Sequence, residues 1–111
     1  MKLPDLENAY VPEAKIVKYL LNLEHVRGGK DKAVFFMRFG FTIGQWEVLA
    51  KALLAHAAAH EVASITEKVD IINYIIEGEF NTPDGRQPQV RTVWAIETDN
   101  TAPRFLTAYP L

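Results

Sequence analysis

Residues 69–97, VDIINYIIEGEFNTPDGRQPQVRTVWAIE, decide the fold class. Two runs rich in Ile, Val and aromatic residues flank the turn TPDGR at 82–86. Its Asp-Gly pair supplies the positive φ angles that a tight hairpin turn needs. Similar runs occur on either side, with a connection expected at 98–103. Strands are expected at Glu61–Thr66, Val69–Phe80, Gln89–Glu97 and Arg104–Tyr109. Their short connections favour an antiparallel meander.

The first half of the chain has helical periodicity instead. Helices are expected over 12–23, 30–40 and 42–60, and Gly40 suits the end of the second. The third opens on TIGQ, a capping-box pattern. The apolar stripes comprise Ile16, Tyr19, Leu20 and Leu23, then Ala33, Phe36 and Met37, then Trp46, Leu49, Ala50, Leu53 and Leu54. We predict a single α+β domain over residues 1–111, with about three N-terminal helices packed on a C-terminal four-stranded antiparallel sheet.

Composition excludes several classes of function. The 111 residues hold no cysteine, which excludes disulfides, thiolate zinc sites and cysteine nucleophiles. No apolar stretch follows the first lysine, and Val48–Ala59 is too short to span a membrane. We therefore expect a cytoplasmic protein. The net charge of −2 argues against a protein that coats nucleic acid, yet it allows a local basic site that closes on one phosphate.

The densest basic stretch follows the first helix. His25 is succeeded by Arg27, Lys30 and Lys32. A group that titrates near neutrality beside fixed positive charge suits acid–base chemistry on a phosphate ester. The alternative is a solvated polar loop. The sequence has no Gly-rich phosphate loop and no nucleophile elbow.

Two arginines of the sheet half are further candidates. Arg86 closes the Asp-Gly turn, where a purely structural role is the alternative. Arg91 lies within a predicted strand, and in the last strand Thr107 and Tyr109 share a face by alternation. Whether Arg91 joins them depends on strand register, which the sequence leaves open. An exposed arginine and a structural tyrosine are the alternative.

A pair of histidines raises the question of a metal. His56 and His60 lie one helical turn apart, so both are able to face one ion. The spacing HAAAH lacks the glutamate of the metalloprotease motif. A helix end, where positive histidine is favourable, is the more ordinary interpretation. We expect no metal site, and keep metal binding as a minor alternative.

The chain resembles a family of small bacterial domains of unknown function. The resemblance covers roughly positions 8 to 111 and rests on AKIVKYLLNLEH, KAVFF, TPDGR, VRTVWAIET and RFLTAYPL. A weaker similarity, carried by the lysine–tyrosine–leucine–leucine and arginine–threonine–valine–tryptophan stretches, is to toxin domains of the barnase–EndoU–colicin–RelE group. Those domains are metal-independent ribonucleases. They place His or Lys from the helical half against Arg, Thr and Tyr of the sheet.

This second resemblance implies a site and a function. The implied catalytic residues are His25, Lys32, Arg91, Thr107 and Tyr109. Lys15 and Lys30 are implied as secondary, substrate-binding residues, and Arg86 is a further substrate-binding candidate from its place in the sequence. His25 would be the general base, Tyr109 or Lys32 the proton donor, Arg91 with Lys32 the charge stabiliser, and Thr107 the orienting group. The implied protein is an RNA-cleaving toxin that needs no cofactor and is neutralised by a small antitoxin protein encoded nearby. A non-enzymatic interaction module, such as an antitoxin or immunity protein, is the alternative.

Overall fold

Four antiparallel strands form the sheet in the order β1-β2-β3-β4, which confirms the predicted meander. The computed structural model describes residues 1–24 and 29–111. The strands are β1 (Val62–Glu67), β2 (Ile71–Glu79), β3 (Gln89–Glu97) and β4 (Asn100–Pro110). The predicted turn at 82–86 lies in the β2–β3 connection, where Gly85 takes a φ of 86°. The α+β class and the order of elements are therefore as the sequence predicts.

The β3–β4 turn is shorter than predicted. Glu97 pairs directly with Asn100, so most of the expected connection at 98–103 belongs to β4. Pro103 is tolerated within β4 because this is an edge strand, where a missing N–H breaks no sheet hydrogen bond. The outer edge of β4 is covered by Tyr10, whose N–H donates to the Pro103 carbonyl while its carbonyl accepts from Phe105.

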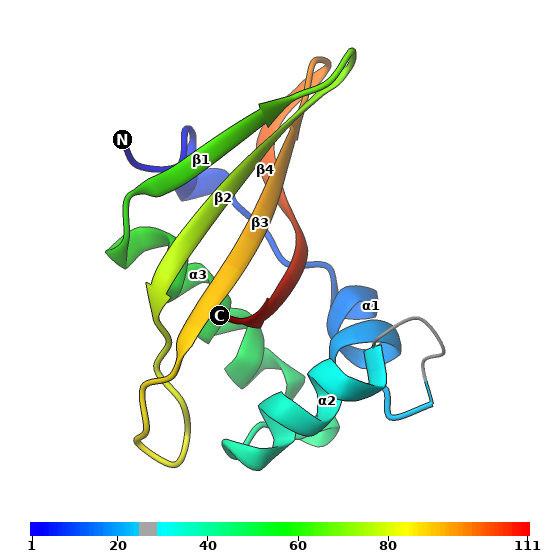
Figure 1. Cartoon of the computed structure of the whole chain (residues 1–111). Coiled ribbons are helices and arrows are strands. Elements are labelled where there is room, and N and C mark those ends of the chain that lie inside the picture. Colours follow the sequence, from blue (N-terminus) through cyan, green and yellow to red (C-terminus); the bar gives the residue numbers. More distant parts are fainter. Residues whose placement is uncertain (25–28) are drawn as a thin grey trace.

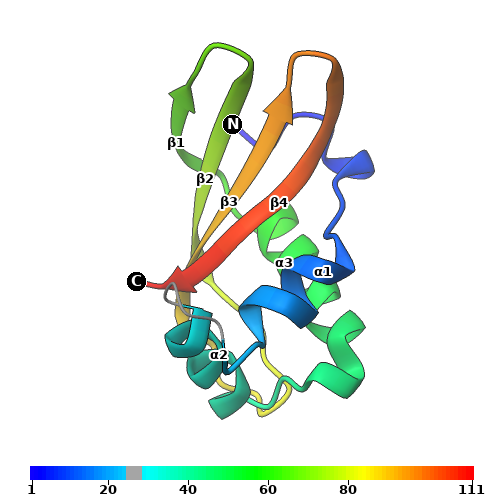
Figure 2. The ribbon, with the colours of Figure 1, turned by 90° about the vertical axis from the view of Figure 1, so that its right-hand side faces the viewer.

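The helices cover one face of the sheet. The helical elements are η1 (Leu6–Asn8), α1 (Glu13–Lys15), η2 (Ile16–Leu20), α2 (Gly29–Arg38), η3 (Ile43–Gln45) and α3 (Trp46–Ala59). In Figure 1 α3 passes behind the sheet, and Figure 2 shows α1 and α3 on the same side of it. α2 contacts β4 near the C-terminus of the chain. The other face of the sheet carries no helix in either view.

The first helix is shorter and wider than its periodicity predicts. After α1 the chain widens into the π-helical turn η2, in which the Leu21 N–H donates to the Ile16 carbonyl over 2.8 Å. Leu21, which follows η2, is buried. The helix ends at Leu20, so the predicted core residue Leu23 lies beyond it and is 48% exposed. π-turns inside helices are rare and occur frequently at functional sites.

The second and third helices bury the predicted stripes. Ala33, Phe36, Leu49 and Leu53 are fully buried. Gly40 ends α2 with a φ of 105°, a conformation that favours glycine. The predicted capping box does not form, because no side-chain hydrogen bond caps η3 at its N-cap residue.

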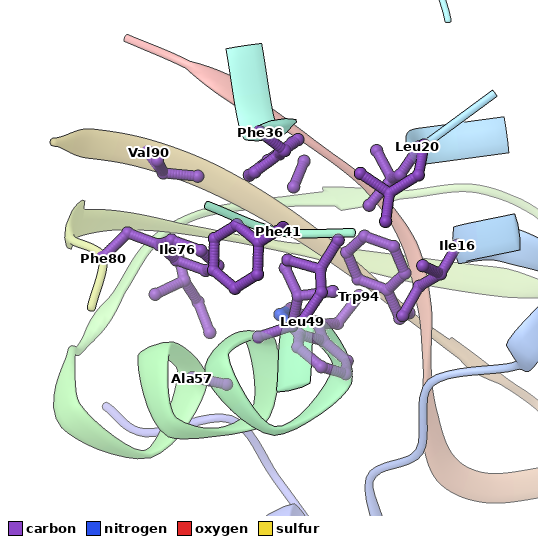
Figure 3. Packing of buried hydrophobic residues seen from close by; sticks show 14 of the residues in the cluster. Ile16, Leu20, Phe36, Phe41, Leu49, Ala57, Ile76, Phe80, Val90 and Trp94 are labelled. Carbon is purple, nitrogen blue, oxygen red and sulfur yellow. The ribbon is translucent and has the colours of Figure 1, made fainter. Parts of the chain in front are cut away.

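One apolar core joins the helices to the sheet. Figure 3 shows side chains from η2, α2, α3 and the strands converging, with Trp94 at the sheet and Leu49 on α3. Phe36, Phe41 and Phe80 pack with ring centroids 5.8–6.1 Å apart, distances typical of favourable aromatic pairs. Among the helices of residues 1–24 and 29–111, none is long and apolar enough to cross a membrane.

Candidate functional site at the β4 edge

Strand register brings three predicted site residues together on the sheet. Arg91 lies opposite Tyr109, and Val93 lies opposite Thr107. Arg91, Thr107 and Tyr109 therefore share the face opposite to the one that the described helices cover. The register question that the sequence leaves open is thus answered in favour of one shared face.

Tyr19 connects this face to the helical half. Its hydroxyl lies 3.0 Å from Thr107 Oγ1 and accepts a short hydrogen bond from Lys32 Nζ. The three groups come from η2, α2 and β4, so they meet where the helices reach the edge of the sheet. The sequence stripe marks Tyr19 only as a core residue. Its amphipathic character, with an apolar ring and a polar tip, was the one signal available.

Lys32 lies between two aromatic rings. Its Nζ is 4.8 Å from the Tyr19 ring centroid and 5.8 Å from that of Tyr109. Both distances allow cation–π attraction. Lys32 and Tyr109, with Asp31 and Pro110, line a pocket of ≈ 470 Å³. Within the described part of the chain Lys32 forms no ion pair, so its charge is available to an anion in that pocket.

Arg91 is held differently. Its guanidinium donates from Nε to Glu77 Oε2 over 2.6 Å and also forms a short ion pair with that carboxylate. From Nη1 it donates to the Tyr109 hydroxyl over 3.2 Å. The Tyr109 hydrogen bond and the Glu77 carboxylate raise the pKa of Arg91 above its ordinary value. Arg91 is therefore a compensated cation that fixes the orientation of Tyr109.

The surroundings of Tyr19 favour loss of its proton. Burial alone would raise the pKa of its phenol, because burial disfavours the charged form. The hydrogen bonds to Lys32 and Thr107 and the charges of Lys32 and Lys15 act in the opposite direction. Together they lower the pKa of Tyr19 below its ordinary value. The phenolate that forms on proton loss thus has cations beside it.

The remaining predicted residues have separate places. Lys15 Nζ lies 5.6 Å from the Tyr19 ring centroid, at the margin of the same cluster. Arg86 stacks 4.2 Å above the Phe39 ring, donates to the Arg38 carbonyl and binds Asp84. These contacts favour the structural alternative for Arg86. His25 and the side chain of Lys30 lie outside the described residues.

The histidine pair serves the fold. His56 is 3% exposed, and its Nε2 donates to the carbonyls of Val90 and Gly78. Its Nδ1 therefore accepts from the Thr92 hydroxyl, 3.1 Å away. His60 Nε2 donates to the Glu79 carbonyl over 2.8 Å. Across residues 1–24 and 29–111 no cluster of three metal-ligating side chains occurs.

The fold and this edge define a small α+β domain whose polar cluster joins its helices to its sheet. The chain belongs to the family called Domain of unknown function (DUF6883), whose model matches residues 2–111. No curated protein matches the sequence significantly. The fold is similar to that of a chain in a solved structure described as a contact-dependent growth inhibition toxin–immunity protein complex from Klebsiella pneumoniae 342. The two chains are 18% identical over 96% of each, with a TM-score of 0.71, so the likeness concerns the fold.

Proposed function

We propose that this domain is a toxin that cleaves RNA in the cytoplasm without a metal ion and is neutralised by a dedicated protein partner. The observation that carries the proposal is the meeting of Lys32, Thr107 and two tyrosines at the β4 edge. A cation that forms no ion pair in the described part of the chain, beside hydroxyl groups, suits a phosphodiester. The similarity of the fold to a chain of a toxin–immunity complex supports the toxin class.

The proposed reaction is attack of an RNA 2′-hydroxyl on the adjacent phosphorus. The O2′–P bond forms and the P–O5′ bond breaks, which leaves a 2′,3′-cyclic phosphate and a 5′-hydroxyl. Lys32, lining the pocket, stabilises the charge that develops on the phosphoryl oxygens. Thr107 orients the phosphate. His25 keeps its predicted role as general base, and Tyr109 or Lys32 its predicted role as proton donor.

Lys32 is a better electrostatic partner for phosphate than Arg91. The Glu77 carboxylate already compensates Arg91, whereas no ion pair occupies Lys32 in the described chain. A phosphate at Arg91 would meet repulsion from Glu77. We therefore assign the direct contact with the phosphate to Lys32. Arg91 holds the Tyr109 hydroxyl in place.

The test is RNA cleavage in EDTA. The wild-type domain should cleave single-stranded RNA to products with cyclic phosphate ends, and Lys32→Gln should lose about 10²-fold or more in rate. Lys51→Gln is the matched control, because Lys51 is exposed on α3 and the charge change is the same. Intact RNA after long incubation with high enzyme concentrations, with ribosomes present, would exclude the ribonuclease.

Growth of producing cells tests the toxin separately. Expression of the wild-type domain should slow growth, and both Lys32→Gln and His25→Ala should relieve the effect. Equal growth of wild type and variants would remove the toxin assignment even if RNA is cleaved in vitro.

A non-enzymatic interaction module is the second candidate, and the Arg91–Glu77 pair favours it. A cation that is already compensated is more typical of a structural or docking surface than of a phosphate site. Under this alternative the domain binds a protein partner through the open sheet face. RNA would then remain intact, and a protein complex would form whose affinity does not depend on Lys32.

A further inference from the structure

We propose that Tyr19 is the general acid of this site and donates its phenolic proton to the leaving 5′-oxygen. The inference rests on the proposed ribonuclease function and replaces Tyr109 and Lys32 in the donor role. Three observations carry it: the position of Tyr19 beside the pocket, the direction of its hydrogen bonds, and the cations around it.

The position of the hydroxyl suits proton donation. Tyr19 is half-buried, and its oxygen is one hydrogen bond from Lys32 Nζ, which lines the pocket. A phosphate held by Lys32 therefore brings its ester oxygens close to the same hydroxyl. Tyr19 lies within the π-turn η2, and turns of this kind recur at functional sites.

The hydrogen-bond directions leave the phenolic hydrogen on the side away from Lys32. The ammonium group of Lys32 has only donors, so the Tyr19 oxygen accepts from it. Thr107 Oγ1 lies 3.0 Å from the Tyr19 oxygen, and in the proposed arrangement the Tyr19 hydroxyl donates to it. An ester oxygen that takes the place of Thr107 as acceptor receives the same hydrogen. Thr107 thus positions the proton before the substrate arrives.

The charges around Tyr19 favour the donor role over the base role. Lys32 from α2 and Lys15 from α1 both lower the pKa of the phenol, and Thr107 from β4 adds a hydrogen bond in the same direction. A lowered phenol pKa makes Tyr19 a stronger proton donor than an ordinary tyrosine. Proton transfer leaves a phenolate that the two lysines stabilise. In the reaction the 2′-hydroxyl proton goes to the base, the Tyr19 proton goes to O5′, and solvent restores both.

Tyr109 is less suited to this role. Its hydroxyl accepts a hydrogen bond from Arg91 Nη1, and Arg91 is itself held by Glu77. Tyr109 faces Lys32 with its ring rather than its hydroxyl, with the ammonium 5.8 Å from the ring centroid. It therefore walls the pocket. Tyr19 instead presents its oxygen to Lys32.

The decisive experiment replaces the leaving atom. Tyr19→Phe should cleave ordinary RNA about 10²- to 10⁴-fold more slowly than wild type, the range typical of general-acid loss. A substrate with sulfur in place of the bridging 5′-oxygen leaves as a thiolate and needs no proton. On that substrate Tyr19→Phe and wild type should cleave within about threefold of each other, because the acid no longer contributes. Tyr10→Phe, which makes the same chemical change on a 41% exposed ring, is the control.

Two further measurements separate catalysis from structure. The variant should bind an oligonucleotide with 2′-deoxyribose at the cleavage site as tightly as wild type does. The alkaline fall of the wild-type rate, which reports ionisation of Tyr19, should be absent in Tyr19→Phe. Full activity of Tyr19→Phe on ordinary RNA, or equal slowing on both substrates, would overturn the inference while leaving the ribonuclease intact. A wild-type domain that cleaves neither substrate would overturn the proposed function and this inference with it.

Discussion

The buried hydroxyl of Thr92 gives a quantitative test of what holds helix α3 to the sheet. Trp94 Nε1 donates to Thr92 Oγ1 over 3.0 Å, and the Thr92 hydroxyl in turn donates to His56 Nδ1. Thr92 and Trp94 are fully buried and His56 is 3% exposed, so water cannot replace a missing partner. Thr92→Val keeps the shape of the side chain and removes both hydrogen bonds.

The magnitude follows from the two groups left without a partner. An unpaired buried donor or acceptor costs roughly 1–3 kcal/mol, so the Trp94 N–H and His56 Nδ1 together cost about 4 kcal/mol. The added methyl group of valine returns about 1 kcal/mol. The expected loss is therefore about 3 kcal/mol, a large part of the ~5–15 kcal/mol that stabilises an ordinary domain.

Urea unfolding followed by tryptophan fluorescence measures this loss. With a slope of about 1.5 kcal/mol per molar urea, the midpoint should fall by about 2 M. Thr92→Ser keeps the hydroxyl and removes one methyl group, so it should cost only about 1 kcal/mol. Thr66→Val, on the exposed strand β1, should stay within about 0.5 kcal/mol of wild type. A Thr92→Val domain more stable than Thr92→Ser would refute the hydrogen-bond network.

The same network predicts that the domain loses stability in acid and when a methyl group is added beside the His60 ring. Burial, followed by the charge of His60, lowers the pKa of His56, so below about pH 6.5 the unfolded chain binds a proton that the folded chain does not. Urea midpoints should therefore fall as the pH is lowered from 7 toward the pKa of His56 in the folded state. His60→Gln should keep most of this pH dependence, because burial is the larger cause of the lowered pKa. Midpoints that do not change with pH would contradict this prediction. Gly78→Ala places a Cβ 2.6 Å from the His60 ring and should destabilise the domain by about 1–3 kcal/mol. In a His60→Ala background the same change should cost clearly less, and equal costs in a double-mutant cycle would show that the ring is not the obstacle.

The sheet could be predicted from local signals because its connections are short. The Asp-Gly turn predicts that β2 and β3 pair as a hairpin, and the alternation in β3 predicts the face that carries Thr92 and Trp94. The position of Arg91 relative to Tyr109 could not be predicted. It depends on an irregularity in the β3–β4 ladder between Val93 and Trp94, and a shift of one residue moves every later side chain to the other face.

The place of the Tyr19 hydroxyl in the candidate site could not be predicted from the sequence either. A period of 3.6 residues places it in an apolar stripe with Leu23, but the chain forms the π-turn η2 at Ile16–Leu20 and leaves the helix there. Leu23 therefore lies beyond the helix and is exposed, and the Tyr19 hydroxyl reaches the sheet edge. Arg86 differs from Tyr19 in that the sequence left two roles open for it. The sequence offered both a binding and a structural role, and its contacts with Asp84 and Phe39 favour the structural one.

Charge at the β4 edge reconciles an acidic chain with the proposed phosphate-binding site. The net charge of −2 is that of the whole chain. On the open sheet face Glu77 forms an ion pair with Arg91, and Glu97 forms one with Arg104. Within residues 1–24 and 29–111 Lys32 forms no ion pair, and it contacts the Tyr19 hydroxyl and the rings of Tyr19 and Tyr109. The positive charge of Lys32 acts mainly on groups nearby, because salt at physiological concentration screens charges beyond about 8 Å. Such a site suits the one scissile phosphate of the proposed reaction better than a long stretch of nucleic-acid backbone.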